Sequence, residues 1–249
     1  MEQVPVQFDV GPEEMRSDQV PWTKRDLFWS IFLGAGAMFG LALPMMAALA
    51  WLVGVTGRTE WQYLSGGTIL VAELGLLVPV WLLGIRKYRL TWRSVGFRGF
   101  QQSRALGLGC LFLLVSFAFN AGWAVLLGLF SLRAQPDVLP VFGGGELGLL
   151  VALVVGGVAA PIAEEAFFRG FLFAGLRQHV GRWSALTLSA GLFALAHVLP
   201  TSWPPIFVLG VVFALLYDQT GSIWPAVIAH GAINTLGLLA SYLLSVLPA

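Results

Sequence analysis

Two adjacent glutamates and a following arginine interrupt an apolar stretch in the second half of the chain. They are Glu164, Glu165 and Arg169, within the sequence PIAEEAFFRG. A charge at the centre of a membrane helix costs about 3 kcal/mol on insertion scales, so a functional purpose is the default interpretation. Glu165 and Arg169 have the spacing of an ion pair on one helix face. Glu164 points roughly 100° away and stays available for acid–base chemistry. The structural alternative is that the motif only closes one end of its helix.

Two of the three histidines also lie in apolar stretches. His197 ends the sequence Phe193-Ala-Leu-Ala-His, and His230 begins His-Gly-Ala-Ile-Asn, which ends at Asn234. The last two are four residues apart, so they share a helical face, and both can donate hydrogen bonds. The structural alternatives are packing for His197 and interhelical hydrogen bonding for His230 and Asn234.

These residues together contain the groups that peptide hydrolysis requires. A carboxylate can deprotonate water, and polar N–H groups can stabilise the oxyanion of a tetrahedral intermediate. The groups come from three separate segments, around Glu164, His197 and His230. We therefore expect an enzyme that hydrolyses peptide bonds within or beside the membrane.

The three motifs, in this order, resemble those of the CPBP family. This family comprises the CAAX proteases and bacteriocin-processing enzymes and is also called the Abi family. The motifs are Glu-Glu-x-x-x-Arg at 164–169, Phe-x-x-x-His at 193–197 and His-x-x-x-Asn at 230–234. Residues 216–226 (LYDQTGSIWPA) are similar to that family's approach to its last motif, and residues 92–97 (WRSVGF) are similar to the segment before its core. The resemblance covers residues 147–242.

The resemblance implies a role for each motif residue. Glu164 and His197 correspond to the pair thought to activate water in members that trim prenylated CAAX proteins. His230 and Asn234 correspond to the residues assigned to the oxyanion. The supporting residues are Glu165, Arg169 and Phe193. The substrate does not carry over from the family; we expect a membrane-associated peptide or protein.

Two further hypotheses remain open at this point. One is a zinc protease in which His197, His230 and Glu164 bind the metal, with Glu165 as the base. The chain has no His-Glu-x-x-His motif, so we favour a reaction without a cofactor. The other is a membrane protein, such as an immunity factor, that binds a peptide in the same polar site without cleaving it.

The composition indicates that the segments around Glu164, His197 and His230 lie in a membrane. Of the 249 residues, 57% are hydrophobic and 11% charged, and the mean hydropathy is +0.81. A soluble domain carries about 25% charged residues, so lipid must cover much of this surface. The net charge of +1 gives no indication of nucleic-acid binding. We predict an all-α, polytopic helix bundle with about seven transmembrane helices, at residues 27–55, 63–85, 105–130, 147–176, 183–199, 205–217 and 223–247.

Basic residues predict how the bundle is oriented. Residues 86–104 contain six basic residues and no acid, which places this loop in the cytoplasm. The amino terminus and the loop at 177–182 then lie on the same side. Twelve of the fourteen basic residues are arginine, which favours a bacterial origin and hence the plasma membrane. We expect a cytoplasmic segment at 1–26, anchoring helices at 27–146 and a catalytic core at 147–249.

Two remaining polar residues receive a structural interpretation. Glu73 is a single acid in the second predicted span, where interhelical hydrogen bonding or snorkelling explains it. His179 lies in a basic loop, where we expect it to be solvated.

The depth of the three motifs in the membrane is one difficulty, because upright helices would place Glu164, His197 and His230 at different levels. Tilted helices, or a broken fifth and sixth span, would bring them together.

Overall fold

The computed structural model describes residues 20–57, 63–132, 138–197 and 199–247. Every regular element in these ranges is helical, and no strand occurs among them. The predicted all-α membrane bundle is therefore confirmed. Residues 1–19 of the predicted amino-terminal segment lie outside the described part of the chain.

Six helical segments of the described chain are long and apolar enough to cross a membrane. They are Lys24–Thr56, Tyr63–Arg86, Ala105–Gly128, Gly145–Val180, Pro200–Thr220 and Trp224–Val246. Large apolar side chains such as Leu106, Leu114 and Leu129 are exposed on their outer faces. In a bundle without enough charge to cover its surface, these faces are the ones that lipid contacts.

Several of these segments are interrupted by π-helical turns. The first span consists of α1 (Lys24–Ala35), η1 (Gly36–Leu41) and α2 (Ala42–Thr56), and the second of α3 (Tyr63–Gly75), α4 (Leu77–Pro79) and η3 (Val80–Arg86). The third is α5 (Gln102–Gly128). The fourth contains α6 (Gly145–Val154), η6 (Val155–Ala159), α7 (Ala160–Glu165), η7 (Ala166–Phe173) and α8 (Ala174–Val180). The chain ends with α9 (Arg182–Leu195), the short 3-10 turn η8 (Pro200–Ser202), α10 (Trp203–Thr220) and α11 (Trp224–Val246).

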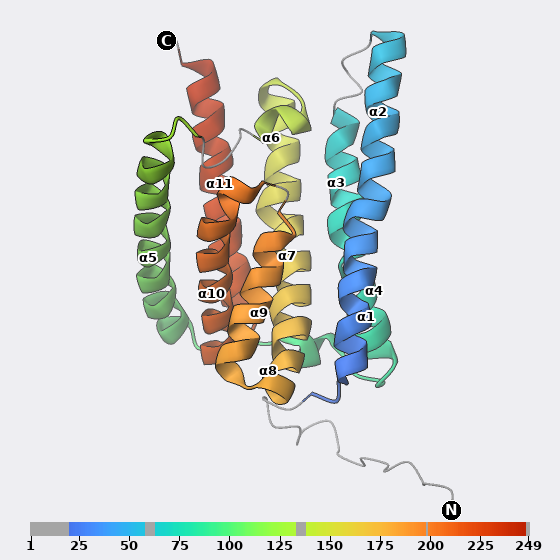
Figure 1. Cartoon of the computed structure of the whole chain (residues 1–249), viewed down its shortest axis with the longest axis vertical. Helices are drawn as coiled ribbons and strands as arrows, with labels where there is room; N and C mark the ends of the chain where they lie inside the picture. The colour runs from blue at the N-terminus through green and yellow to red at the C-terminus, as the bar shows by residue number, and fades with distance from the viewer. Residues whose placement is uncertain (1–19, 58–62, 133–137, 198, 248–249) are drawn as a thin grey trace, which may run out of the picture.

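The segment predicted as a fifth span, 183–199, is shorter than expected. Its helix α9 has only 14 residues, or about 21 Å at the usual rise, whereas the hydrocarbon core is about 30 Å thick. A 3-10 turn begins at Pro200, and α10 then returns beside α9. The α9–α10 hairpin therefore ends well below the upper ends of α2 and α11 (Figure 1). The predicted broken pair of spans is this hairpin.

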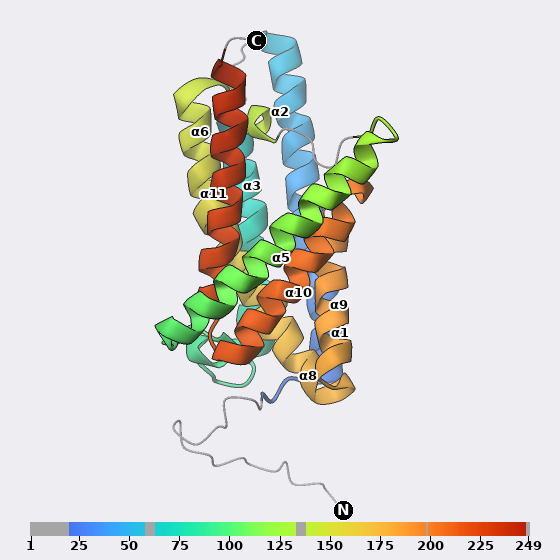
Figure 2. The ribbon, with the colours of Figure 1, turned by 90° about the vertical axis from the view of Figure 1, so that its left-hand side faces the viewer.

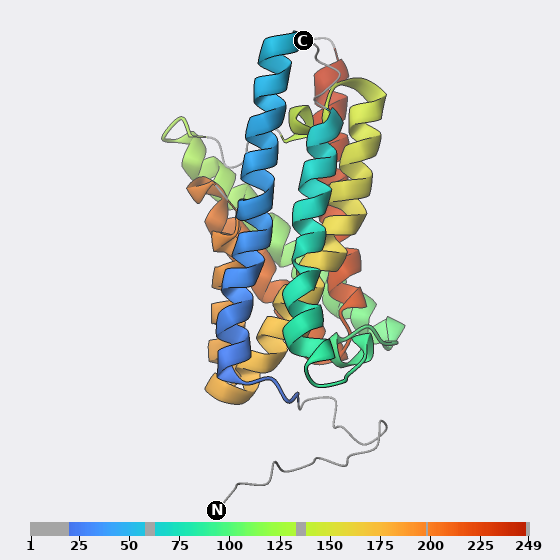
Figure 3. The same cartoon turned by 90° about the vertical axis from the view of Figure 1, so that its right-hand side faces the viewer.

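The helices pack so that the first half of the chain contacts the second. Helix α5 crosses α10 and α11 diagonally on one side of the bundle (Figure 2). On another side, α3 lies between α2 and α6 (Figure 3) and also contacts α7. The buried core joins Trp22 and Leu76 of the first half to Phe171 and Phe193 of the second. Glycine permits some of these approaches, since a Cβ on Gly84 would lie 2.9 Å from the Phe171 ring.

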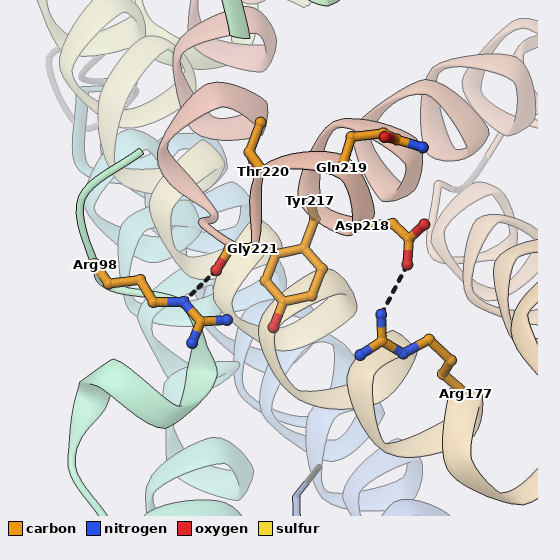
Figure 4. A pocket seen from close by; sticks show the side chains of 7 residues that line it. All are labelled: Arg98, Arg177, Tyr217, Asp218, Gln219, Thr220 and Gly221. Atoms are coloured by element: carbon orange, nitrogen blue, oxygen red, sulfur yellow. Dashed lines mark hydrogen bonds and ion pairs between the residues drawn. The ribbon is translucent and has the colours of Figure 1, made fainter. Parts of the chain in front are cut away.

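The basic segments gather at one end of the bundle, which we call the basic end and define by residues 86–101 and 177–182 (Figure 1). Asp218 accepts from Arg177 and Arg182 at 2.8 and 2.7 Å. Arg98 donates to the carbonyl of Gly221, which ties the loop before α5 to the end of α10. Figure 4 shows the polar cavity of about 230 Å³ among these groups, lined by Arg98, Arg177, Tyr217, Asp218, Gln219, Thr220 and Gly221.

Two other contacts hold the start of the first span at this end. His179 Nε2 lies 2.9 Å from the carbonyl oxygen of Trp22, so the prediction that His179 is merely solvated is wrong. Asp26 is buried and accepts a hydrogen bond from Lys87 Nζ at 2.6 Å. This hydrogen bond raises the pKa of Lys87 above its usual value. The contact joins α1 to the segment that follows the second span.

Candidate active site

A fully buried ion pair forms the centre of the candidate site. Arg169 Nη1 lies 2.9 Å from Glu165 Oε1, and both side chains have 0% exposure. This is the ion pair expected from their spacing. Arg169 Nη2 donates to the carbonyl of Gly210 on α10 at 3.3 Å. The guanidinium also lies 4.2 Å from the ring centroid of Phe193 and 5.2 Å from that of Phe213. Aromatic faces stabilise a desolvated cation, so the apolar surroundings are compatible with this charge.

His230 on α11 binds the same carboxylate from the other side. Its Nδ1 lies 2.9 Å from Glu165 Oε1, and its ring stacks on Phe213 with centroids 4.9 Å apart. Because Glu165 is the partner of a cation, its oxygen accepts and His230 Nδ1 carries the hydrogen. The other ring nitrogen, Nε2, is then the atom available for chemistry. It lies 3.7 Å from Glu164 Oε2, which is longer than a direct hydrogen bond.

Glu164 is the last residue but one of α7 and is also buried, with 7% exposure. Its Oε2 atom is buried and has no hydrogen-bond partner among the described residues. Buried polar atoms in folded proteins nearly always have a partner, so an orphaned carboxylate oxygen indicates a role for a bound molecule or a proton. The π-helical segments η6 and η7 flank α7 on both sides. Such turns often occur at functional sites, since they rotate the following side chains out of the regular helical register.

Glu73 of α3 reaches the site, which the sequence interpretation missed. It has 9% exposure, and its side chain is in hydrogen-bonding contact with that of Glu164. Of the two explanations expected from the sequence, interhelical hydrogen bonding agrees with this contact, whereas snorkelling is wrong, because the carboxyl group lies inside the bundle. The signal was present in the sequence: an ionisable residue within a span is a functional candidate even without a neighbouring motif.

His197 lies just beyond the end of α9 and is partly buried. Its Nδ1 is 2.9 Å from the carbonyl oxygen of Phe193, and its ring packs against the Phe193 ring at 5.1 Å. The same Phe193 ring contacts His230 at 5.8 Å. Because α9 ends partway along the bundle, His197 reaches the level of His230. Within the described ranges, no hydrogen bond or ion pair joins His197 directly to Glu164.

Asn234 lies one helical turn beyond His230 on α11. Its amide nitrogen donates to the carbonyl of Gly156 in η6 at 2.8 Å. The backbones of α11 and η6 lie close together because residue 231 has no side chain. A Cβ on Gly231 would lie 2.6 Å from the carbonyl oxygen of Gly157. One amide hydrogen of Asn234 is thus engaged, and a carboxamide carries a second.

The zinc hypothesis from the sequence places His197, His230 and Glu164 around one metal ion. In the described part of the chain, no group of three or more His, Cys, Asp or Glu side chains is placed to hold a metal ion. His197 Nδ1 contacts a backbone carbonyl, and His230 Nδ1 contacts Glu165. Both contacts use Nδ1 and leave the Nε2 atoms unengaged, so they do not decide between the zinc hypothesis and a reaction without a metal.

The chain resembles known membrane proteases in the region that contains these residues. The family described as "Type II CAAX prenyl endopeptidase Rce1-like" matches residues 146–236. This match includes all three motifs. This match, together with the bacterial relatives below, supports a membrane protease, and therefore a hydrolase, that resembles the CPBP family. No solved structure matches the chain significantly.

Two bacterial relatives extend the similarity. "Putative membrane peptidase YdiL" of Bacillus subtilis (strain 168) is 24% identical over 204 residues, which cover 78% of this chain and 80% of the relative. "UPF0177 protein YxdF" of Lactococcus lactis subsp. lactis (strain IL1403) is 28% identical over 95 residues, or 37% of this chain and 51% of the relative. The first similarity extends beyond residues 146–236 into other parts of the chain.

The close approach of α11 to η6 predicts the effect of one substitution. Gly231→Ala should lower the free energy of unfolding by about 1–3 kcal/mol, because the added methyl group meets a backbone carbonyl that cannot rotate away. It should also lower the cleavage rate by displacing His230 and Asn234. The control is Gly237→Ala on the same helix, where a Cβ meets no atom within 4 Å. Thermal unfolding in detergent should show a lower midpoint for Gly231→Ala alone; equal midpoints would contradict the close approach.

Proposed function

We propose that this chain hydrolyses peptide bonds of membrane-associated proteins or peptides, with Glu164 as the base that activates water. The observation that carries the proposal is the buried, unpartnered Oε2 atom of Glu164, 3.7 Å from His230 Nε2. This gap is too long for a direct hydrogen bond, so a water molecule beside both atoms could contact each of them. The neighbouring Glu165 also has an unpartnered Oε2 atom, but its Oε1 atom accepts from both Arg169 and His230, so this carboxylate already serves as the partner of a cation.

The reaction follows from the groups that surround this oxygen. Glu164 removes a proton from water while the water oxygen bonds to the carbonyl carbon of the substrate. The C=O double bond opens to an oxyanion, which accepts hydrogen bonds from His230 Nε2–H and from the second amide hydrogen of Asn234. When the C–N bond breaks, Glu164 returns the proton to the leaving amine. Because Nδ1 donates to Glu165, donation from Nε2 requires a second hydrogen on the ring.

His197 would help to position the water. Its Nδ1 lies at hydrogen-bonding distance from the Phe193 carbonyl, so Nδ1 carries the hydrogen and Nε2 has a free lone pair. That lone pair can accept the second hydrogen of the attacking water. The family resemblance assigns His197 and Glu164 to the same water, and the Phe193 ring that touches both histidines supports their placement on one cavity wall.

Glu164→Gln tests the proposed base directly. The amide has nearly the same shape but cannot accept a proton, so turnover should fall by at least about 100-fold while the protein still folds. The measurement compares peptide fragments in membranes of cells that produce the wild-type chain or the variant. Glu146→Gln, which removes an exposed carboxylate at the start of α6, is the control and should match the wild type. A well-expressed, fully active Glu164→Gln variant would disprove this role.

Asn234→Ala separates the oxyanion role from the zinc alternative. Removing one oxyanion donor typically costs about 100- to 1000-fold in turnover, with substrate binding less affected. We expect such a loss in kcat with little change in KM, and no inhibition by strong chelators. Asn120→Ala, at an exposed position on α5, should have no effect. Stoichiometric zinc in the purified protein, with reversible inhibition by chelators, would instead support the metal mechanism.

We place the protein in a bacterial plasma membrane with its basic end in the cytoplasm. The two relatives are bacterial, and basic residues near span ends favour the cytoplasmic side. In a Cys110→Ser background, an impermeant maleimide should label Glu146→Cys, at the opposite end, on intact cells. It should label Thr91→Cys, an exposed position of the basic end, only after lysis. Labelling of Thr91→Cys on intact cells would show that the basic end faces the outside.

A further inference from the structure

We propose that the polar cavity at the basic end binds a phosphate group, and that the headgroup of an anionic phospholipid supplies it. The cavity of about 230 Å³ lies among Arg98, Arg177 and Tyr217 (Figure 4). A cavity needs only about 10–15 Å³ of such volume to hold a water molecule, so a phosphate group fits with room for water. The lining includes none of the candidate active-site residues, and binding can be measured without any cleavage.

The hydroxyl group of Tyr217 carries the first step of the argument. Tyr217 lies on α10, and only 4% of its surface is exposed. Its hydroxyl points into the cavity, between the guanidinium groups of Arg98 and Arg177 (Figure 4), and makes no hydrogen bond to another group of the described chain. Buried polar groups nearly always have a partner, which ordered water or a ligand supplies where the protein does not. A phosphate oxygen would accept the hydrogen of this hydroxyl.

The charges around the cavity carry the second step. Asp218 is the acidic residue of the lining, and its two carboxylate oxygens accept from Arg177 and Arg182 at 2.8 and 2.7 Å. Arg98 adds a third guanidinium group, so three arginines and one aspartate give this group of residues a net charge of +2. The cavity therefore favours an anion, because the charge of Asp218 is already offset by its own partners.

The donors of the cavity come from three separate segments. Arg98 lies in the segment before α5, Arg177 on α8 and Tyr217 on α10. The contact of Arg98 with the Gly221 carbonyl holds one guanidinium in place, and the ion pair with Asp218 holds the other. A guanidinium has several N–H groups in a planar fork, which suits phosphate oxygens. Because a tetrahedral phosphate presents oxygens in several directions and a carboxylate only two in one plane, this arrangement favours phosphate over the carboxyl terminus of a peptide.

The position of the cavity along the bundle favours a lipid headgroup as the source of the phosphate. Arg177 lies about one turn before its span ends at Val180. Tyr217 likewise lies about one turn before Thr220, and Arg98 precedes the third span. Span ends lie at the level of the headgroups, just outside the hydrocarbon core. Basic pockets between transmembrane helices at this level are suited to anionic headgroups.

Lipid titration of the purified full-length protein in detergent tests the site. Native mass spectrometry should show phosphatidylglycerol bound at a concentration at which phosphatidylcholine, whose headgroup has no net charge, is not retained. Tyr217→Phe keeps the ring and removes the hydroxyl, so the Kd for phosphatidylglycerol should rise about 10-fold, as expected for the loss of one hydrogen bond to a charged group. The control is Tyr242→Phe, near the end of α11 and far from the basic end, which should match the wild type.

A second pair of variants separates this site from general attraction between charges. Arg177→Gln and Arg93→Gln each remove one positive charge from the basic end, but Arg177 lines the cavity whereas Arg93 is exposed. Arg177→Gln should weaken phosphatidylglycerol binding by at least about 10-fold, and Arg93→Gln by less than about 2-fold. Asp218 keeps Arg182 as its partner in Arg177→Gln. If Arg177→Gln does not fold, the result for Tyr217→Phe decides the question.

Thermal unfolding distinguishes the two sources of phosphate. Phosphatidylglycerol should raise the unfolding temperature of the wild type more than that of Tyr217→Phe, because a ligand of the folded state stabilises it in proportion to its affinity. Inorganic phosphate at equal ionic strength should change neither. A rise with inorganic phosphate in the wild type alone would support the site and overturn the lipid source. Equal lipid binding by the wild type, Tyr217→Phe and Arg177→Gln, or equal losses in Arg177→Gln and Arg93→Gln, overturns the proposal.

Discussion

The arrangement of the site depends on placing the charge of Arg169 at a fully buried position inside the bundle. The guanidinium has one carboxylate partner, Glu165, and one backbone partner, the carbonyl of Gly210. Leaving one member of such a buried pair without its partner typically costs about 3–5 kcal/mol. The cost explains why the neighbouring elements converge on this point: α7 supplies the acid, α10 the carbonyl, α9 the Phe193 ring and α11 the second ligand of the acid, His230.

The pair also explains how two adjacent glutamates differ in function. Glu165 Oε1 accepts from both Arg169 and His230, so it orients the imidazole and fixes which nitrogen of His230 faces the site. Glu164 points to another side of the helix, where its contacts are Glu73 and the distant Nε2 of His230. A helix rotates by about 100° per residue, so consecutive residues meet different neighbours. Identical side chains thereby acquire a structural role and a proposed chemical role.

Irregular backbone brings the remaining residues to the same level. The π-helical segments around α7 shift the register of the fourth span, and α9 ends after 14 residues instead of crossing the bundle. His197 consequently lies beside Phe193, whose ring also touches His230. On α11, Gly231 allows the backbone to approach η6 closely enough for Asn234 to bind Gly156. In a membrane, the hydrophobic effect does not drive helices together. Close packing at small residues and hydrogen bonds between helices hold them instead.

The sequence by itself determined the membrane bundle, the resemblance to a protease family and the contacts within single helices. Hydropathy predicts spans because unsatisfied backbone is excluded from lipid, and the four-residue spacing of Glu165 and Arg169 predicts their ion pair because helix geometry is regular. Contacts between helices have no such periodic signal. The short α9, the backbone contact of His197 and the meeting of Glu73 with Glu164 depend on how deeply each helix lies and how it is rotated. Packing of distant segments sets that depth and rotation, so only the tertiary structure decided them.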